Sequence, residues 1–140
     1  MNKPKVEMRE ISEAPNLQEL KDIFGVDEKY LIIAYGDKIY VKGKELSPDL
    51  LVHELTHCER QGFNALDAKR WYEKYMRDKD FRLKEESVAY AGQFAYCKRV
   101  YKDRNKQAKI LWMLAEHLAG SQYGNIISHS EAMNLIKNMV

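Results

Sequence analysis

The stretch LLVHELTHCER, residues 50–60, has the apolar content of a buried helix but carries two histidines and a glutamate. The Ser-Pro-Asp segment at 47–49 is typical of a helix start, because serine can cap, proline suits the first turn and aspartate complements the helix dipole. Gly62 can end the helix. We therefore predict a helix from about Pro48 to Gln61, with the polar side chains in its middle.

The two histidines share one face of this predicted helix. At 100° per residue, His53 and His57 lie about 40° apart in azimuth and one turn apart along the axis, so both imidazoles can reach one point. An apolar group on the opposite side should face the core, and it consists of Leu51, Leu55 and Cys58. Two neutral imidazoles at this spacing form half of a tetrahedral zinc site, and Glu54 lies beside them to handle a proton.

The pentapeptide at 53–57 resembles HExxH, the active-site motif of the zincin metallopeptidases. Two hydrogen-bonded surface histidines are the alternative, but shuffling this composition gives HExxH only about once in a hundred chains. Metzincins continue with a glycine and a third histidine, where this chain has Arg60 and Phe63. The resemblance is therefore to gluzincins, which take a glutamate from a later helix as the third ligand.

Glu86 is the residue that this resemblance implies as the third ligand. The segment around it is also similar to the Glu-x-x-Ala signature of minigluzincins and small repressor-cleaving peptidases, with Ala89 matching. An aspartate or asparagine often follows in these groups at the position of Tyr90, so the subfamily is not assigned. The neighbouring Glu85 is an alternative ligand.

Helical geometry separates the two glutamates. With Glu86 at 0°, an apolar stripe lies within about 60° of it, formed by Leu83, Ala89, Tyr90, Cys97 and Val100. Glu85 falls at about −100°, off this stripe. A carboxylate in an apolar stripe needs a cation, which zinc or, alternatively, a buried Arg or Lys could supply.

The resemblance implies an intracellular zinc peptidase with a limited or regulatory substrate range. One Zn²⁺ per chain would be held by His53, His57 and Glu86, with Glu54 as the general base for metal-activated water. Tyr90, one turn after Glu86, could donate to the oxyanion, although a core tyrosine is an equally ordinary role, and His117 is the next candidate. We expect His117 itself to be packed beside Leu111, Leu114 and Leu118. A non-catalytic zinc-dependent protein- or DNA-binding module on the same fold is the alternative function.

The flanking segments predict a small α+β domain, zincin-like and single over residues 1–140. A hairpin is expected across Gly36 and Asp37, after a weaker strand signal in KVEMREI at 5–11. Helices are expected over 15–25, over 64–76 with Leu66, Trp71, Tyr72 and Tyr75 partly buried, over 81–102, over 106–119 and from a Ser128–Glu131 capping box onward. A small N-terminal sheet thus precedes a helical part that carries the metal site.

The bulk properties limit the partners. Lys and Arg number 23 against 21 Asp and Glu, so the net charge of +2 creates no strong field for nucleic acid or a membrane surface. No signal core or membrane-spanning run is present, and the two cysteines suit free thiols, so we expect a soluble cytoplasmic protein acting on a protein or peptide. A basic run is more typical of a solvated face, with nucleic-acid docking as the alternative: Lys98, Arg99, Lys102 and Arg104.

Overall fold

The computed structural model describes residues 4–140 and confirms an α+β fold with a small sheet and six α-helices in that part of the chain. The expectation that the N-terminus has no signal core concerns in part residues 1–3, which lie outside the described residues. In chain order the elements are β1 (Glu7–Arg9), α1 (Leu17–Phe24), β2 (Ile32–Tyr35), β3 (Lys38–Val41), α2 (Pro48–Arg60), α3 (Ala65–Arg77), α4 (Lys79–Val100), α5 (Arg104–Leu118) and α6 (His129–Met139).

The sheet has the order β1-β3-β2, so β2 is an edge strand. The predicted hairpin is confirmed, with β2 antiparallel to β3, while β1 pairs with β3 in parallel. Gly36 in the turn has a φ of +67°, and a Cβ there would lie 2.7 Å from the backbone of Asn64. The turn therefore requires glycine both for its conformation and for its contact with the start of α3.

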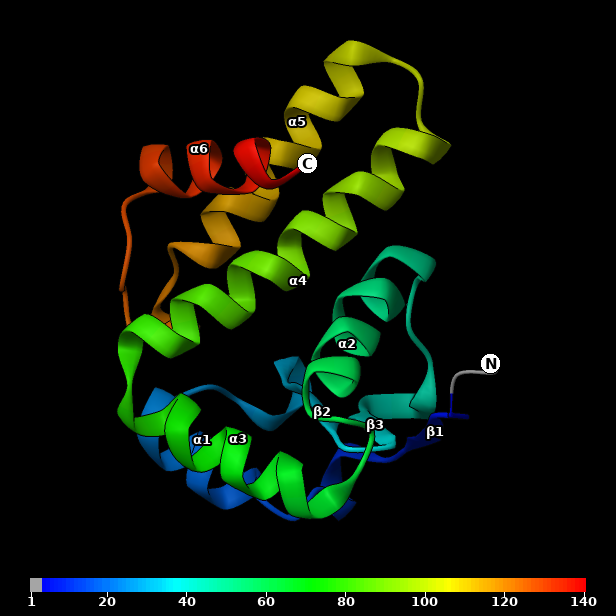
Figure 1. Ribbon diagram of the computed structural model, residues 1–140, viewed down its shortest axis with the longest axis vertical. Coiled ribbons are helices and arrows are strands. Elements are labelled where there is room, and N and C mark those ends of the chain that lie inside the picture. Colours follow the sequence, from blue (N-terminus) through cyan, green and yellow to red (C-terminus); the bar gives the residue numbers. More distant parts are fainter. Residues whose placement is uncertain (1–3) are drawn as a thin grey trace.

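Helix α2 lies between the sheet and the long helix α4 (Figure 1). Its expected apolar face is confirmed, because Cys58 is fully buried against Ala34 and Ile39 of the sheet, with Leu51 and Leu55 packed around it. The opposite face of α2 approaches α4. Helices α5 and α6 cover the other side of α4 (Figure 1) and form a second core around Phe94, Leu114, Leu118 and Ile136.

Helix α3 buries its three aromatic residues Trp71, Tyr72 and Tyr75, as expected. The prediction for Leu66 is wrong, since its side chain is 63% exposed. Leu66 lies about 120° to 180° around the helix from the three aromatic residues, so one helix cannot bury all four against one core.

Cys58 and Cys97 are both free and buried, as expected for thiols that serve as small apolar side chains. None of the helices in residues 4–140 combines the length and the hydropathy that a bilayer span requires.

Candidate metal centre

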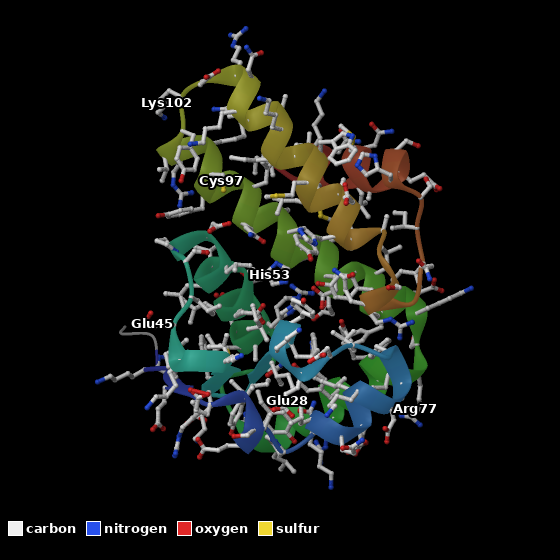
Figure 2. All side chains as sticks on the ribbon, turned by 180° about the vertical axis from the view of Figure 1, so that it is seen from behind. Glu28, Glu45, His53, Arg77, Cys97 and Lys102 are labelled. Carbon is white, nitrogen blue, oxygen red and sulfur yellow. The ribbon has the colours of Figure 1, made fainter. Side chains whose placement is uncertain are left out.

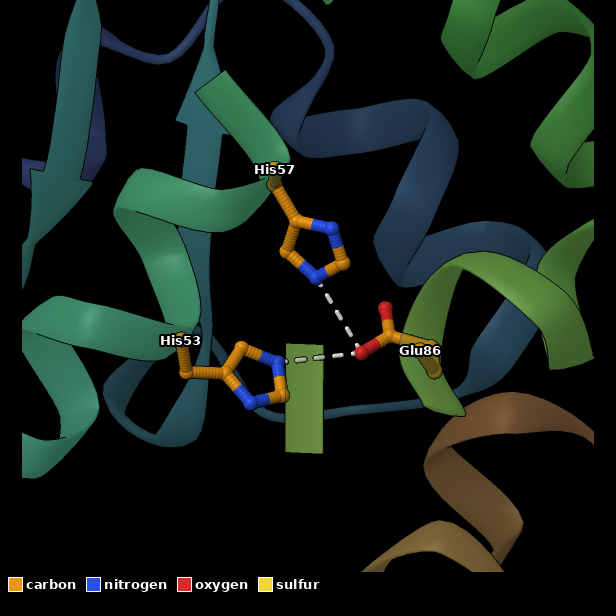
Figure 3. Close-up of side chains that lie close together, drawn as sticks. All are labelled: His53, His57 and Glu86. Carbon is orange, nitrogen blue, oxygen red and sulfur yellow. Dashed lines mark hydrogen bonds and ion pairs between the residues drawn. The ribbon is translucent and has the colours of Figure 1, made fainter. Parts of the chain in front are cut away.

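The two histidines of α2 and Glu86 of α4 meet in one buried group (Figure 3). The Nε2 atoms of His53 and His57 each lie 3.1 Å from Oε1 of Glu86. Ligand atoms bound to zinc at about 2.0–2.1 Å with tetrahedral angles are separated by about 3.3 Å. The three side chains therefore have the spacing of a metal site and could hold one metal ion.

The neighbours of Glu86 keep its carboxyl group ionised and fix its orientation. Burial alone would raise the pKa of its carboxyl group, but the neighbouring His57 and His53 hold that pKa well below its ordinary value. The hydroxyl of Tyr75, from α3, donates to Oε2 of Glu86 at 2.7 Å and leaves Oε1 directed at the histidines. The site thus offers one fixed carboxylate oxygen and two imidazole nitrogens, a donor set suited to divalent transition metals.

His53 is oriented from behind by a chain of hydrogen bonds that starts at Gln93. Its Nδ1 lies 3.0 Å from Oε1 of Gln93, whose Nε2 donates to Oδ2 of Asp49 at 2.8 Å. Since the Asp49 carboxylate only accepts, the amide nitrogen must face Asp49 and the amide oxygen must face the imidazole. With a metal ion between His53 and Glu86, the proton of His53 would therefore stay on Nδ1 and the Nε2 lone pair would face the metal.

The role of Gln93 was not predicted from the sequence, where Tyr90, one turn after Glu86, was the residue of this helix given a catalytic role. The signal was present, because Gln93 follows Glu86 by two helical turns and lies within about 20° of it in azimuth. Asp49 was noted only for its favourable place at the start of α2.

Replacing Gln93 with leucine should weaken zinc binding by about ten- to a hundredfold, because the imidazole of His53 loses its acceptor. Competition against a chelator measures the change. The matched control is Gln107→Leu on α5, whose amide donates to the carbonyl of Tyr101 away from the site. Equal zinc affinities in the two variants would refute the orienting role of Gln93.

Glu54 lies beside the metal-binding atoms without taking part in the group. Its Oε2 is 4.0 Å from Nε2 of His53, and its side chain is buried. Burial raises the pKa of the carboxyl group to about 8, the charge of Glu86 adds to the rise, and His53 opposes it. Within residues 4–140 no hydrogen bond to this carboxyl group is seen, and its ionic contact is the one with His53, so its proton affinity is set mainly by burial.

Like Tyr75, the tyrosines Tyr90 and Tyr123 line the cavity beside the site. The ring of Tyr90 packs edge-on against His53 with 4.4 Å between centroids, and its hydroxyl is 2.7 Å from that of Tyr123. Tyr123 comes from the connection between α5 and α6, where no helical period could have linked it to the motif. The expectation that His117 is packed is wrong: it is exposed and lines the same cavity, because it lies at the border of the apolar face of α5.

Glu85 is buried too, although it was expected off the inward-facing stripe. Arg60 donates to both of its carboxylate oxygens at 2.7 to 2.9 Å, and Nε1 of Trp71 donates at 2.7 Å. Burial would raise the pKa of Glu85, but these hydrogen bonds lower it below its ordinary value. Glu85 therefore has a structural ion pair of its own, and only Glu86 reaches the histidines.

A cavity of about 780 Å³ adjoins the His-His-Glu group and is lined in part by Glu54 and Tyr90. The basic residues at the α4–α5 junction do not line this cavity. All four are exposed: Lys98, Arg99, Lys102 and Arg104. Figure 2 shows Lys102 at one end of the molecule and His53 in its middle. The basic run and the candidate metal centre are thus separate features.

Comparison of the chain with protein-family models, with curated proteins and with solved structures gave no match. Function is therefore inferred from the geometry and chemistry of the site.

Proposed function

We propose that the protein is a zinc-dependent peptidase of the zincin type, with one Zn²⁺ per chain held by His53, His57 and Glu86. The observation that carries this proposal is the buried group of two imidazoles and one carboxylate with a second, unrestrained carboxylate, Glu54, beside it. Three protein ligands leave one tetrahedral position open, which is typical of catalytic zinc sites, whereas structural sites use four.

The residues around the site fit peptide hydrolysis. When bound, Zn²⁺ supplies the Lewis acidity that activates a water molecule and polarises the scissile carbonyl. Glu54 takes a proton from the attacking water and returns it to the leaving amine, since its carboxyl group lines the same cavity and makes no hydrogen bond within the described residues. Its buried position keeps its proton affinity closer to neutral pH than that of an exposed glutamate.

The sheet edge supports an extended peptide as the substrate. In a two-residue hairpin the residues that flank the turn form a hydrogen-bonded pair, so Ala34 and Ile32 direct their backbone groups away from β3. The carbonyl of Ala34 is already taken by the Tyr72 hydroxyl at 2.7 Å and the Gln61 amide at 3.1 Å. Ile32 lines the cavity, so its outward backbone groups are the ones that a substrate strand could pair with.

The alternative is a zinc-dependent module that binds protein or DNA without catalysis. The exposed basic run at the α4–α5 junction is the feature that favours it. Glu54 favours the peptidase, because burying a carboxylate without a hydrogen-bond partner is costly and a module that only binds has no use for it. Zinc-dependent hydrolysis of peptides by the native chain, and its loss in Glu54→Gln, distinguishes the two.

Removing the hydroxyl of Tyr90 should lower turnover by about tenfold or more if that hydroxyl donates to the oxyanion. Tyr90→Phe keeps the ring against His53, so we expect zinc affinity to change little, while the lost hydrogen bond to Tyr123 should cost about 1 kcal/mol of stability. Tyr96→Phe on the same helix is the matched control, and kcat is the quantity to compare. An unchanged kcat in Tyr90→Phe would place the electrophile elsewhere, with His117 as the next residue to test.

A further inference from the structure

We propose that the cavity beside the candidate metal centre takes an apolar side chain from the interior of a peptide and cannot hold a free carboxylate. The protein would then cut internal bonds and would not trim C-termini. This inference rests on the proposed peptidase function and names the substrate class of the same site.

Part of the cavity lining is apolar and comes from two parts of the chain. The segment from α1 to β2 and one face of α5 contribute Leu20, Phe24, Leu31, Ile32, Met113 and Leu114. The volume of the cavity, about 780 Å³, lies within the range of ligand-binding pockets, about 300–1,000 Å³. Burial of a substrate leucine, isoleucine, methionine or phenylalanine against this part of the lining is favourable because it removes apolar surface from water.

Apart from three histidines, which are the two candidate ligands and His117, the ionic residues of the lining are all acidic. Asp27, Asp49, Glu54 and Glu86 line the cavity, and within residues 4–140 no Lys or Arg does. The carboxylates of Asp27, Asp49 and Glu86 alone outweigh the two positive charges of a bound Zn²⁺. A substrate carboxylate would therefore lose its water there without gaining a cationic partner, which is unfavourable.

A buried arginine nearby does not alter this balance. Arg82 donates to the backbone carbonyls of Tyr123 and Tyr75 at 2.9 and 2.6 Å, and its guanidinium lies 5.0 Å from the ring of Phe24. Phe24 and Tyr75 line the cavity, whereas Arg82 does not. The guanidinium of Arg82 thus binds backbone and aromatic groups behind the cavity lining and is not available to a substrate.

Anchoring of a substrate amino terminus is not favoured either. Both oxygens of Asp49 already accept hydrogen bonds, from Gln93 and from Ser47. Asp27 is exposed and accepts from the backbone N–H of Lys29. The acidic groups of the lining thus serve the local structure, and the chain on both sides of the scissile bond is free to continue.

The first test is cleavage of synthetic dodecapeptides, each prepared as the free acid and as the C-terminal amide, with free and acetylated amino termini. With zinc-loaded protein we expect interior cuts beside apolar residues, at equal rates for acid and amide, and mass spectrometry identifies the products. Stepwise loss of single residues from either end, or faster cleavage of the acids, would overturn the inference. If no peptide is cut, the proposed peptidase function fails. The inferred chemistry of the cavity is then tested by ligand binding alone.

The binding test uses three small hydroxamates, each of which has the same metal-binding group: acetohydroxamate, N-acetyl-leucine hydroxamate and N-acetyl-aspartate hydroxamate. Calorimetry with zinc-loaded protein should show the leucine compound about tenfold or more tighter than acetohydroxamate, since its side chain is buried. The aspartate compound should gain nothing. Tighter binding of the aspartate compound than of the leucine compound contradicts the proposed chemistry of the cavity.

A charge placed in the lining provides the matched control. Met113→Arg adds a cation to the lining and should improve binding of the aspartate compound, whereas Val100→Arg adds the same charge at an exposed position outside the lining. We expect the improvement only in Met113→Arg. An equal improvement in both variants would show that overall charge selects the ligand, and the inference would fall.

Discussion

Glu86→Ala should abolish tight zinc binding, and with it any zinc-dependent activity. The substitution removes the only carboxylate among the three candidate ligands, and the loss should exceed the ten- to hundredfold that an outer hydrogen-bond partner contributes. It also leaves the hydroxyl of Tyr75 without its acceptor. Metal content per chain, measured after dialysis against a weak chelator, gives the result directly.

Glu85→Gln is the control for this experiment, because it changes the neighbouring carboxylate and keeps an acceptor for Trp71. It should retain a full equivalent of zinc. Glu85→Ala should also retain zinc but should lose about 1–3 kcal/mol of stability, since Arg60 and Trp71 lose a buried partner. Zinc retained by Glu86→Ala, or lost by a folded Glu85→Gln, would reverse the assignment of the third ligand.

Glu54→Gln should keep the fold and the zinc while hydrolysis falls by about 10²- to 10⁴-fold. Glutamine has the shape of glutamate but cannot accept a proton at neutral pH, so only the proton transfer is removed. The rates of peptide cleavage by the two proteins at equal zinc content are the measurement. Chelation of the metal should abolish cleavage in the native chain.

The control for Glu54→Gln is Glu73→Gln, an exposed exchange of the same type on α3. It should have native activity and native zinc content. If Glu54→Gln were as active as Glu73→Gln, a base at Glu54 would be excluded and the proposed mechanism with it.

The parts of the site that could be predicted are those that depend on the sequence of a single helix, either α2 or α4. The spacing of His53 and His57, and the inward direction of Glu86, follow from the 3.6-residue period of α2 and α4. Their meeting in one buried group is confirmed by the packing of those two helices. The hairpin and the start of α2 at Pro48 were predictable for the same reason, because turn and helix-start signals are local. The expected cap by Ser47 is not made, since its hydroxyl donates to Asp49 and no backbone N–H donates to it.

Contacts between elements could not be derived in this way. The pairs Gln93–Asp49, Tyr90–Tyr123 and Glu85–Arg60 join residues of different elements, and no period within one helix specifies which partner the packing brings close. The burial of Glu85 shows the limit most clearly. Its azimuth was derived correctly, but an angle around a helix does not reveal that a second helix covers that side as well.

The occupied carbonyl of Ala34 also bears on self-association. An exposed edge strand is a template on which further copies of a chain can stack, and it is a common origin of aggregation. At the β2 edge, Tyr72 and Gln61 occupy the outward carbonyl of Ala34, so the outward carbonyl of Ile32, beside the cavity, is the one left for an incoming strand. So short a free stretch is enough to align a peptide that other contacts hold, but it is too short to start a growing intermolecular sheet at the β2 edge.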